Sequence, residues 1–295
     1  MLTTKQKVFL AGQAQGLIVF LRSAFGKTYL ADVHRKRLRW ELDLREGIDF
    51  SIYLLGAFEP GTARTLAKLL KQNDIAFDIG ANMGAHTLAM AQSVGPAGKV
   101  FAIEPADFAF AKLRRNLALN PELEGRVQAA QIFFGRSATS LPPAEVYASW
   151  PLGNDAAVHP KHRGRLVSAG QSTMDTLDSF VQRQQLSRLD VIKIDVDGQE
   201  LPVLQGGLAT LRRFRPVLVM EIAPYVHAEH NNSFAEFVEL LKGIEYSLSD
   251  ADTGEPIPLD AGDLERMIPD GASINAVARA DKVAEPVARL DAAIL

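Results

Sequence analysis

Cysteine is absent from this chain of 295 residues. Its absence excludes a disulfide framework, a thiolate metal site and a cysteine nucleophile. It also suits a reducing compartment, so we expect a cytoplasmic location. Long apolar runs are lacking as well, because the longest early run, residues 16–21, falls far short of the roughly 18 residues that a membrane span needs. We therefore expect no transmembrane segment.

An excess of charge of one sign is also missing, since the formal net charge is only −3. Without a basic excess, bulk electrostatics gives no reason to expect a nucleic-acid partner. Hydrophobic residues make up 47% of the chain, which is enough for a sizeable core. The length allows one large α/β domain or two small ones. Function must therefore be inferred from motifs, not from composition.

Residues 1–37 are predicted to form an N-terminal helical extension of one or two helices, which ends in the basic run at 34–37. The basic start and the apolar run at 16–21 resemble a secretory signal, but Gln13, Gln15 and Arg22 interrupt the apolar region. The favoured interpretation is an amphipathic helix packed on the body of the protein. The alternative is a helix that rests on a membrane surface.

Residues 38–280 alternate apolar strands with amphipathic helices, which is typical of a parallel sheet with helices on both faces. Residues 281–295 remain as a C-terminal tail. The last two strands flank 251–272, where no convincing helix is found, and predict an antiparallel hairpin at the sheet edge. Residues 135–172 lack periodicity, and a loop of that length is usually functional or disordered. The predicted strands are 38–44, 75–80, 99–105, 126–134, 189–198, 216–222, 246–250 and 273–280, and the predicted helices are 58–70, 82–94, 106–120, 200–214 and 233–243.

Carboxylates stand at the carboxyl ends of at least four predicted strands. They are Asp78, Glu104, Asp195, Asp197 and Glu221. In an open parallel sheet, ligands bind outside these strand ends. A pyrophosphate would be repelled there, whereas a ligand with an ammonium and a sulfonium would be attracted. S-adenosyl-L-methionine carries both groups and is the predicted ligand.

The stretch AFDIGANMG, residues 76–84, supports this ligand. It is similar to a dinucleotide-binding turn, but Asn82 stands where that turn needs a glycine for close approach to pyrophosphate. Adenosylmethionine has no phosphate, so Asn82 is compatible with it, while Gly80 and Gly84 still permit a tight turn. Glu104 lies 24 residues after Gly80 and could accept two hydrogen bonds from a ribose diol. Dinucleotide enzymes make the same contact, so Glu104 alone does not discriminate.

Six stretches occur along the chain in this order: LDLREGIDFSIYLLGAFEP, FDIGANMGAHTLAMA, VFAIEP, NLALN, STMDTLDSF and VIKIDVDGQELPVLQGG. Together they resemble the FkbM-type methyltransferases over about residues 38–280. The segment at 191–207 is the most specific, whereas 1–37 and 141–170 have no counterpart. The resemblance implies a Rossmann-like class I methyltransferase fold, with a seven-stranded mostly parallel sheet, adenosylmethionine as donor, and a hydroxyl acceptor on a sugar- or polyketide-like small molecule.

Position by position, the resemblance also implies a set of donor-binding residues. Asp197 departs from the family's usual Glu at its position but keeps the charge. His86, in the first helix after the turn, is expected to shape the donor pocket rather than to take part in the chemistry. The implied donor-binding residues are Asp78, Gly80, Ala81, Asn82, Gly84, Glu104 and Asp195.

Methyl transfer requires an aligned acceptor oxygen and a route for its proton. The catalytic candidates are Asp195, His227 and His230. Asp195 is expected chiefly to bind the donor and to position the reactants, with roles as base or metal ligand left open. The spacing of His227 and His230 would also suit two metal ligands near Glu221. No metal is predicted, and DVDGQE is too short for an EF-hand loop of about 12 residues.

Two segments, 149–165 and 223–230, concentrate histidine, aromatic and charged residues and are expected to form the acceptor side. A solvated loop is an equally good interpretation of 149–165, and solvated loop histidines are an equally good interpretation of His227 and His230. Two other functions stay open: a nicotinamide-dependent oxidoreductase, opposed by Asn82 and the acidic strand ends, and a non-catalytic partner protein with this fold. The expected partner is a small molecule with a hydroxyl group, and homo-oligomerisation is left open.

Overall fold

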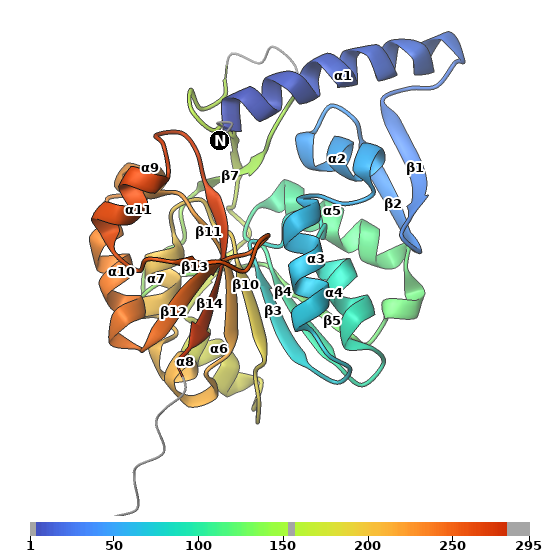
Figure 1. Cartoon of the computed structure of the whole chain (residues 1–295). Coiled ribbons are helices and arrows are strands. Elements are labelled where there is room, and N and C mark those ends of the chain that lie inside the picture. The colour runs from blue at the N-terminus through green and yellow to red at the C-terminus, as the bar shows by residue number, and fades with distance from the viewer. Residues whose placement is uncertain (1–3, 153–156, 282–295) are drawn as a thin grey trace, which may run out of the picture.

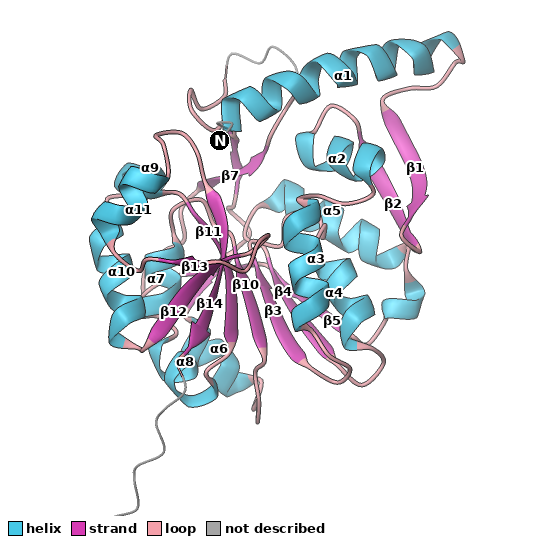
Figure 2. Ribbon diagram, in the orientation of Figure 1, coloured by secondary structure: helices cyan, strands magenta, loops and turns pink. Residues whose placement is uncertain are grey.

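The computed structural model describes residues 4–152 and 157–281. It is an α/β protein built on one eight-stranded sheet with helices on both faces (Figures 1 and 2). The strand order is β13-β12-β14-β11-β10-β3-β4-β5. These strands are β3 (Ile75–Ile79), β4 (Lys99–Ile103), β5 (Val127–Ala130), β10 (Val191–Ile194), β11 (Val217–Ile222), β12 (Tyr246–Asp250), β13 (Pro256–Ile257) and β14 (Ile274–Ala280).

The sheet is mostly parallel, and its order reverses between β3 and β10. From β3 the chain moves outward through β4 to β5, and it then returns to β10 and moves the other way to β11. The predicted antiparallel pair is formed by β12 and β14. β14 lies between β12 and β11 and runs antiparallel to both. The predicted α/β class is confirmed. The two-residue β13, absent from the prediction, adds an eighth strand.

Alternation along the strands divides the core between the two faces of the sheet. In β3, Phe77 and Ile79 pack on one side while Ala76 packs on the other, and in β10 Ile192 and Val191 divide in the same way. The helices that cover the sheet are α3 (Pro60–Leu69), α4 (Thr87–Val94), α5 (Asp107–Ala118), η1 (Pro121–Leu123), α6 (Leu177–Arg183), α7 (Glu200–Gln205), α8 (Leu208–Phe214), α10 (Phe234–Gly243) and α11 (Ala261–Met267).

The N-terminal region is only partly helical. α1 (Thr4–Ala24) lies across the molecule, but residues 30–35, predicted as helix, form β1 (Leu30–Arg35) and pair with β2 (Leu38–Asp43) (Figure 1). Lys36 and Arg37 both have positive φ, as the tight turn of a two-residue hairpin requires. The basic run therefore ends a hairpin, and α2 (Gly47–Leu55), which was not predicted, follows.

Three further predictions differ in detail. The strand expected at 126–134 divides, because β6 (Ile132–Phe134) leaves the main sheet and pairs with β9 (Thr173–Asp175). The helix expected at 200–214 breaks at Gly206 and Gly207, where close neighbours leave no room for a side chain. The region 251–272 contains α11, whose first turn is capped by the Asp260 side chain.

The described part of the aperiodic segment 135–172 includes regular secondary structure. It contains an antiparallel hairpin of β7 (Glu145–Ser149) and β8 (Arg165–Ser168), called the lid hairpin below together with the described residues between its strands. α9 (Pro224–Glu229) follows β11. The predicted C-terminal tail lies, beyond Asp281, outside the described residues. Among the described helices, none is long and apolar enough to cross a membrane.

Candidate active site

A cavity of about 590 Å³ opens at the carboxyl ends of β3, β4, β10 and β11, where the strand order reverses. This is the place where an open α/β sheet binds its ligands. One part of the lining comes from the loops after β3, β4 and β10, and includes Gly80, Ala81, Asn82, Glu104 and Asp195. The other part comes from α1, α2, α9 and the lid hairpin. The predicted donor and acceptor segments therefore share one chamber.

The turn after β3 needs its particular residues for steric reasons. Gly80 has φ +79°, and a Cβ there would overlap the carbonyl oxygen of Asp195. Asn82 has φ +47°, a conformation that Asn tolerates better than most residues. Its side chain donates to Ala148 O at 3.0 Å and accepts from Met83 N at 2.8 Å. Asn82 thus ties the donor turn to the lid hairpin, a role that its sequence position did not reveal.

Glu104 braces the same turn from the end of β4. One carboxylate oxygen accepts from Asn82 N and the other from Ala106 N, each at 2.8 Å. Burial raises the pKa of Glu104 to about 7, although these backbone hydrogen bonds act in the opposite direction. Each carboxylate oxygen keeps a second lone pair, so the group can still accept hydroxyl hydrogen bonds from a ribose.

Lys193 is the central cation of the site, and sequence reasoning assigned it no function. Its ammonium lies 3.4 Å from Asp78 Oδ1, 3.3 Å from Asp195 Oδ2 and 3.1 Å from Gly80 O. Burial alone would lower the pKa of Lys193, but Asp195 and Asp78 raise it above its ordinary value. A lone lysine in the apolar run of β10, between acidic strand ends, is the signal that could have identified it.

Two of the predicted donor-site residues lie behind the cavity wall. Asp78 is fully buried, and its Oδ2 accepts from the Thr87 hydroxyl at 2.6 Å. Its Oδ1 accepts no hydrogen bond among the described residues. A Cβ on Gly84 would press on the side chains of Leu88 and Leu113. Asp78 and Gly84 therefore shape the turn, whereas the other predicted residues face the chamber.

His86 lines the cavity as an almost completely buried neutral ring. Neither of its ring nitrogens has a hydrogen-bond partner among the described residues, although Glu59 Oε2 lies 4.0 Å from Nε2. Burial, and then the charge of Lys193, lower its pKa to about 3. The unsatisfied nitrogens of a buried cavity residue fit a polar ligand, in agreement with the expectation that His86 shapes the donor pocket.

Carboxylates are crowded on the side of the cavity away from Glu104. Burial raises the pKa of Asp197 well above its ordinary value, and the charges of Asp195 and Glu221 raise it further. Burial, followed by Asp195 and Glu59, raises the pKa of Glu221 to about 8. Near neutral pH this cluster therefore retains protons. It can bind a cationic group or donate a hydrogen bond from a protonated carboxyl.

The two histidines after β11 have different surroundings. His230 lines the cavity and is hydrogen-bonded to the backbone of Asp197, while burial lowers its pKa below 6.5. His227 is only 1% exposed and lies outside the described cavity lining, with Nε2 3.6 Å from Glu200 Oε2. Burial lowers the pKa of His227 to about 4. Of this pair, only His230 can contact a ligand in the cavity.

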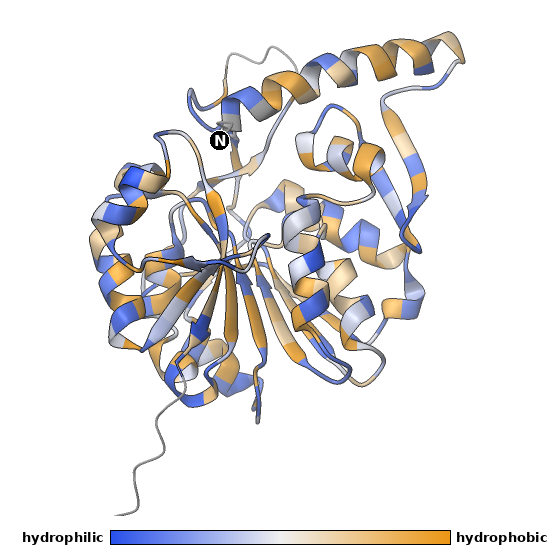
Figure 3. Cartoon of the chain, in the orientation of Figure 1, coloured by the Kyte–Doolittle hydropathy of each residue, from blue (hydrophilic) through white to orange (hydrophobic). Residues whose placement is uncertain are grey.

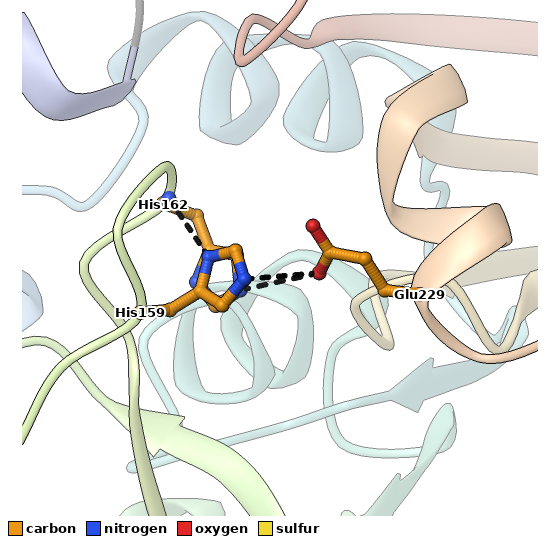
Figure 4. A group of neighbouring side chains, drawn as sticks. All are labelled: His159, His162 and Glu229. Atoms are coloured by element: carbon orange, nitrogen blue, oxygen red, sulfur yellow. Dashed lines mark hydrogen bonds and ion pairs between the residues drawn. The ribbon is translucent and has the colours of Figure 1, made fainter.

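A cluster of His159, His162 and Glu229 joins the lid hairpin to α9 (Figure 4). The two imidazoles stack at 3.9 Å, and their Nε2 atoms lie 3.4 and 3.9 Å from Glu229 Oε2. This spacing would also suit a metal. However, Nδ1 of His162 accepts from Gly164 N at 3.1 Å and Nδ1 of His159 accepts from Lys161 N at 3.3 Å. A neutral ring that accepts at Nδ1 carries its proton on Nε2, so these rings favour donation to Glu229 over metal ligation.

The strand order, the acid-lined strand ends and the turn around Asn82 define the class I methyltransferase fold, with a cavity suited to S-adenosyl-L-methionine. More particularly, the chain belongs to the FkbM methyltransferase domain family, whose model matches residues 78–248. The turn is compatible with this family, since Asn82 stands where a dinucleotide-binding turn needs a glycine for close approach of pyrophosphate.

Two curated relatives are themselves named as methyltransferases. "Methyltransferase sdnD" of Sordaria araneosa is 34% identical over 164 residues, which is 46% of this chain and 61% of the relative. "Hexuronic acid methyltransferase AglP" of Haloferax volcanii is 26% identical over 167 residues, which is 55% of this chain and 61% of the relative. The chain thus matches about three fifths of the length of each. A solved O-methyltransferase from Thermotoga maritima is 14% identical with a TM-score of 0.41, covering 90% of this chain and 83% of that one.

Proposed function

We propose that this chain transfers the methyl group of S-adenosyl-L-methionine to a hydroxyl of a sugar-like or polyketide-like small molecule. The observation that carries the proposal is the single chamber, in which the loops after β3, β4 and β10 face α9 and the lid hairpin. A relative named as a hexuronic acid methyltransferase supports a sugar-like acceptor. The polar groups of the lid hairpin and α9 suit a hydroxylated molecule.

In this proposal Glu104 accepts hydrogen bonds from the ribose of the donor, and Gly80, Ala81 and Asn82 contact the donor through the turn. Asp195, held by Lys193, positions the methionine part and the acceptor. Asp78 and Gly84 lie behind the cavity wall and support the turn that carries these donor-binding residues. The bound donor supplies a methyl group activated by its sulfonium. The residues of the chain align the acceptor and remove its proton.

We propose His230 as the group that takes this proton. As the acceptor oxygen forms its bond to the methyl carbon, the carbon–sulfur bond breaks, and the hydroxyl proton passes to the free nitrogen of the imidazole. The hydrogen bond to the Asp197 backbone holds the ring in place. Because the pKa of His230 is lowered, the ring is unprotonated at neutral pH and is available as a base.

The proposed function is tested by incubating the purified chain with methyl-labelled donor and three probes: glucuronic acid, a neutral hexose and a hydroxylated macrolactone. Label should appear in an O-methyl product of at least one probe, identified by NMR. Calorimetry on the same preparation should show donor binding. Transfer of label only to amines, or donor binding without transfer to any hydroxyl probe, would contradict the proposal.

Histidine variants separate the base from its buried neighbour. His230→Ala should leave donor affinity intact and lower turnover roughly a hundredfold, the usual scale for losing a general base. Because burial lowers the pKa of His230, wild-type turnover should fall on the acid side of neutral pH as this ring becomes protonated, and the variant should lose this acid limb. The pH–rate profile measures both effects.

His227→Ala and His34→Ala are the controls for this experiment. His227 packs on Phe234 and Phe237, so its removal should lower thermal stability but keep the acid limb. His34 is exposed on β1, so His34→Ala should change neither the thermal stability nor the acid limb of the pH–rate profile. If His230→Ala keeps full turnover and the acid limb, His230 is not the base, and alignment by Asp195 becomes the better account.

A further inference from the structure

The outward face of α1 is an apolar surface that the cavity does not explain. Its exposed side chains recur at helical spacing, and Leu17 and Phe20 are 61% and 69% exposed. Figure 3 shows the apolar residues along this helix, which lies at the periphery of the molecule. We call the following set the outer face of α1: Phe9, Leu10, Leu17, Phe20 and Leu21, with Phe25 just beyond the helix.

The opposite face of the same helix is already occupied. Val8, Ala11 and Ile18 pack on the core cluster that contains α2 and β2, and Val8 and Ala11 also line the cavity. α1 is therefore fixed to the body by one side and presents the other side outward. Several large apolar side chains exposed along one side of a helix are typical of an interaction site.

The charges around this face indicate what covers it. Residues 1–31 contain no Asp or Glu, although the whole chain holds 35, and they include Lys5, Lys7, Arg22 and Lys27. Arg22 turns back to donate to Thr28 O and Leu30 O. Lys5 and Lys27 are exposed near the two ends of the helix. Cations thus flank the apolar face, and carboxylates are absent from its own segment.

We propose that α1 docks this protein on an anionic lipid bilayer, with its outer face inserted at the boundary between headgroups and acyl chains. Phenylalanine and leucine on one side with flanking lysines is the pattern of an interfacial helix. Each lysine near an anionic surface adds attraction. A second copy is less suited to this face, because antiparallel pairing would place Lys5 beside the partner copy's Lys27, with no acid in either segment to neutralise them.

Docking is tested by flotation of the full chain with vesicles. The wild type should float with vesicles of phosphatidylcholine and phosphatidylglycerol, and much less with phosphatidylcholine alone. Leu17→Gln with Phe20→Gln should lower the partition coefficient roughly tenfold to hundredfold for each side chain, the scale of burying a large apolar group. Lys5→Glu with Lys27→Glu should lower it at least fivefold per site, on anionic vesicles only.

Matched controls use exposed residues outside α1. Leu119→Gln with Met267→Gln changes two exposed apolar side chains, and Lys71→Glu with Arg212→Glu changes two exposed cations. Both should float like the wild type. Circular dichroism and donor calorimetry should be unchanged in every variant, which keeps this test separate from that of the proposed function.

Three results would overturn the docking proposal. The first is a wild type that stays unbound with anionic vesicles. The second is an α1 variant that floats as well as its control. The third is a wild type that does not bind vesicles and that light scattering shows to be a dimer, which Leu17→Gln with Phe20→Gln dissociates. That result would assign the outer face of α1 to a second copy.

Discussion

Asp195→Asn should lower methyl-transfer turnover by about a hundredfold or more, while the protein stays folded. The substitution keeps the shape of the side chain and removes the negative charge at the end of β10. Lys193 loses one carboxylate partner but keeps Asp78 and the carbonyl oxygen of Gly80. The free energy of unfolding should therefore change far less than the turnover. A hundredfold loss of turnover is the usual scale for removing a positioned catalytic carboxylate.

A second measurement on this variant reports the local electrostatics. Asp195 is one cause of the raised pKa of Glu221, which is about 8. In Asp195→Asn the Glu221 carboxyl should lose its proton at lower pH, as followed by carbon-13 NMR of labelled glutamate. Asp252→Asn is the matched control, because Asp252 lies outside the described cavity lining. It should change neither the turnover nor the pKa of Glu221. Full turnover in Asp195→Asn would remove the residue from the mechanism.

Glu104→Ala should weaken donor binding about tenfold to hundredfold, because charge-assisted hydrogen bonds of roughly 1.5 to 3 kcal/mol are lost. Glu104→Gln keeps one acceptor oxygen and should lose less. The wild-type affinity should also fall as pH drops below about 7, since the carboxyl then holds a proton and accepts the ribose hydroxyls less well. Glu104→Ala should show no such pH dependence. Calorimetry across this pH range measures both effects.

Glu122→Ala is the control for donor binding, because Glu122 is exposed in η1. Glu104 also braces the turn through Asn82 N and Ala106 N, so circular dichroism must confirm that the fold of each variant is retained. Unchanged donor affinity in Glu104→Ala would refute the ribose contact.

The elements that the sequence predicted best are those whose signal is local. β3, β4 and β11 are short apolar runs with an acid at or near their ends, and their predicted limits are within two residues of the observed ones. β10 was predicted at 189–198 but is shorter, Val191–Ile194. The acids converge because parallel strands place their carboxyl ends on one edge of a sheet. The predictions failed where distant residues decide the outcome. β6 leaves the main sheet because β9, some 40 residues away, offers it a partner.

The same division applies within the site. The sequence placed Asn82 in the turn, and Glu104 and Asp195 at the ends of neighbouring strands, and all three line the cavity. Neither the burial of Asp78 behind the wall nor the separation of His227 from His230 could be predicted. These two histidines are three residues apart, but His227 lies within α9 and is buried in the core, whereas His230 follows the end of α9 and lines the cavity. Which of the two histidines is buried depends on how α9 packs against its neighbours, and this packing is not encoded in the local sequence.

The sequence by itself determined the class of the protein, through the order of apolar strands, the acids at their ends and the turn around Asn82. Tertiary structure alone decided what lies across the chamber. It paired Lys193 with Asp78 and Asp195, and it brought His159 and His162 to Glu229. It also left the outer face of α1 uncovered. The reason is physical: a strand or turn is specified by neighbours along the chain, whereas contacts between distant segments depend on which surfaces the packed core brings together.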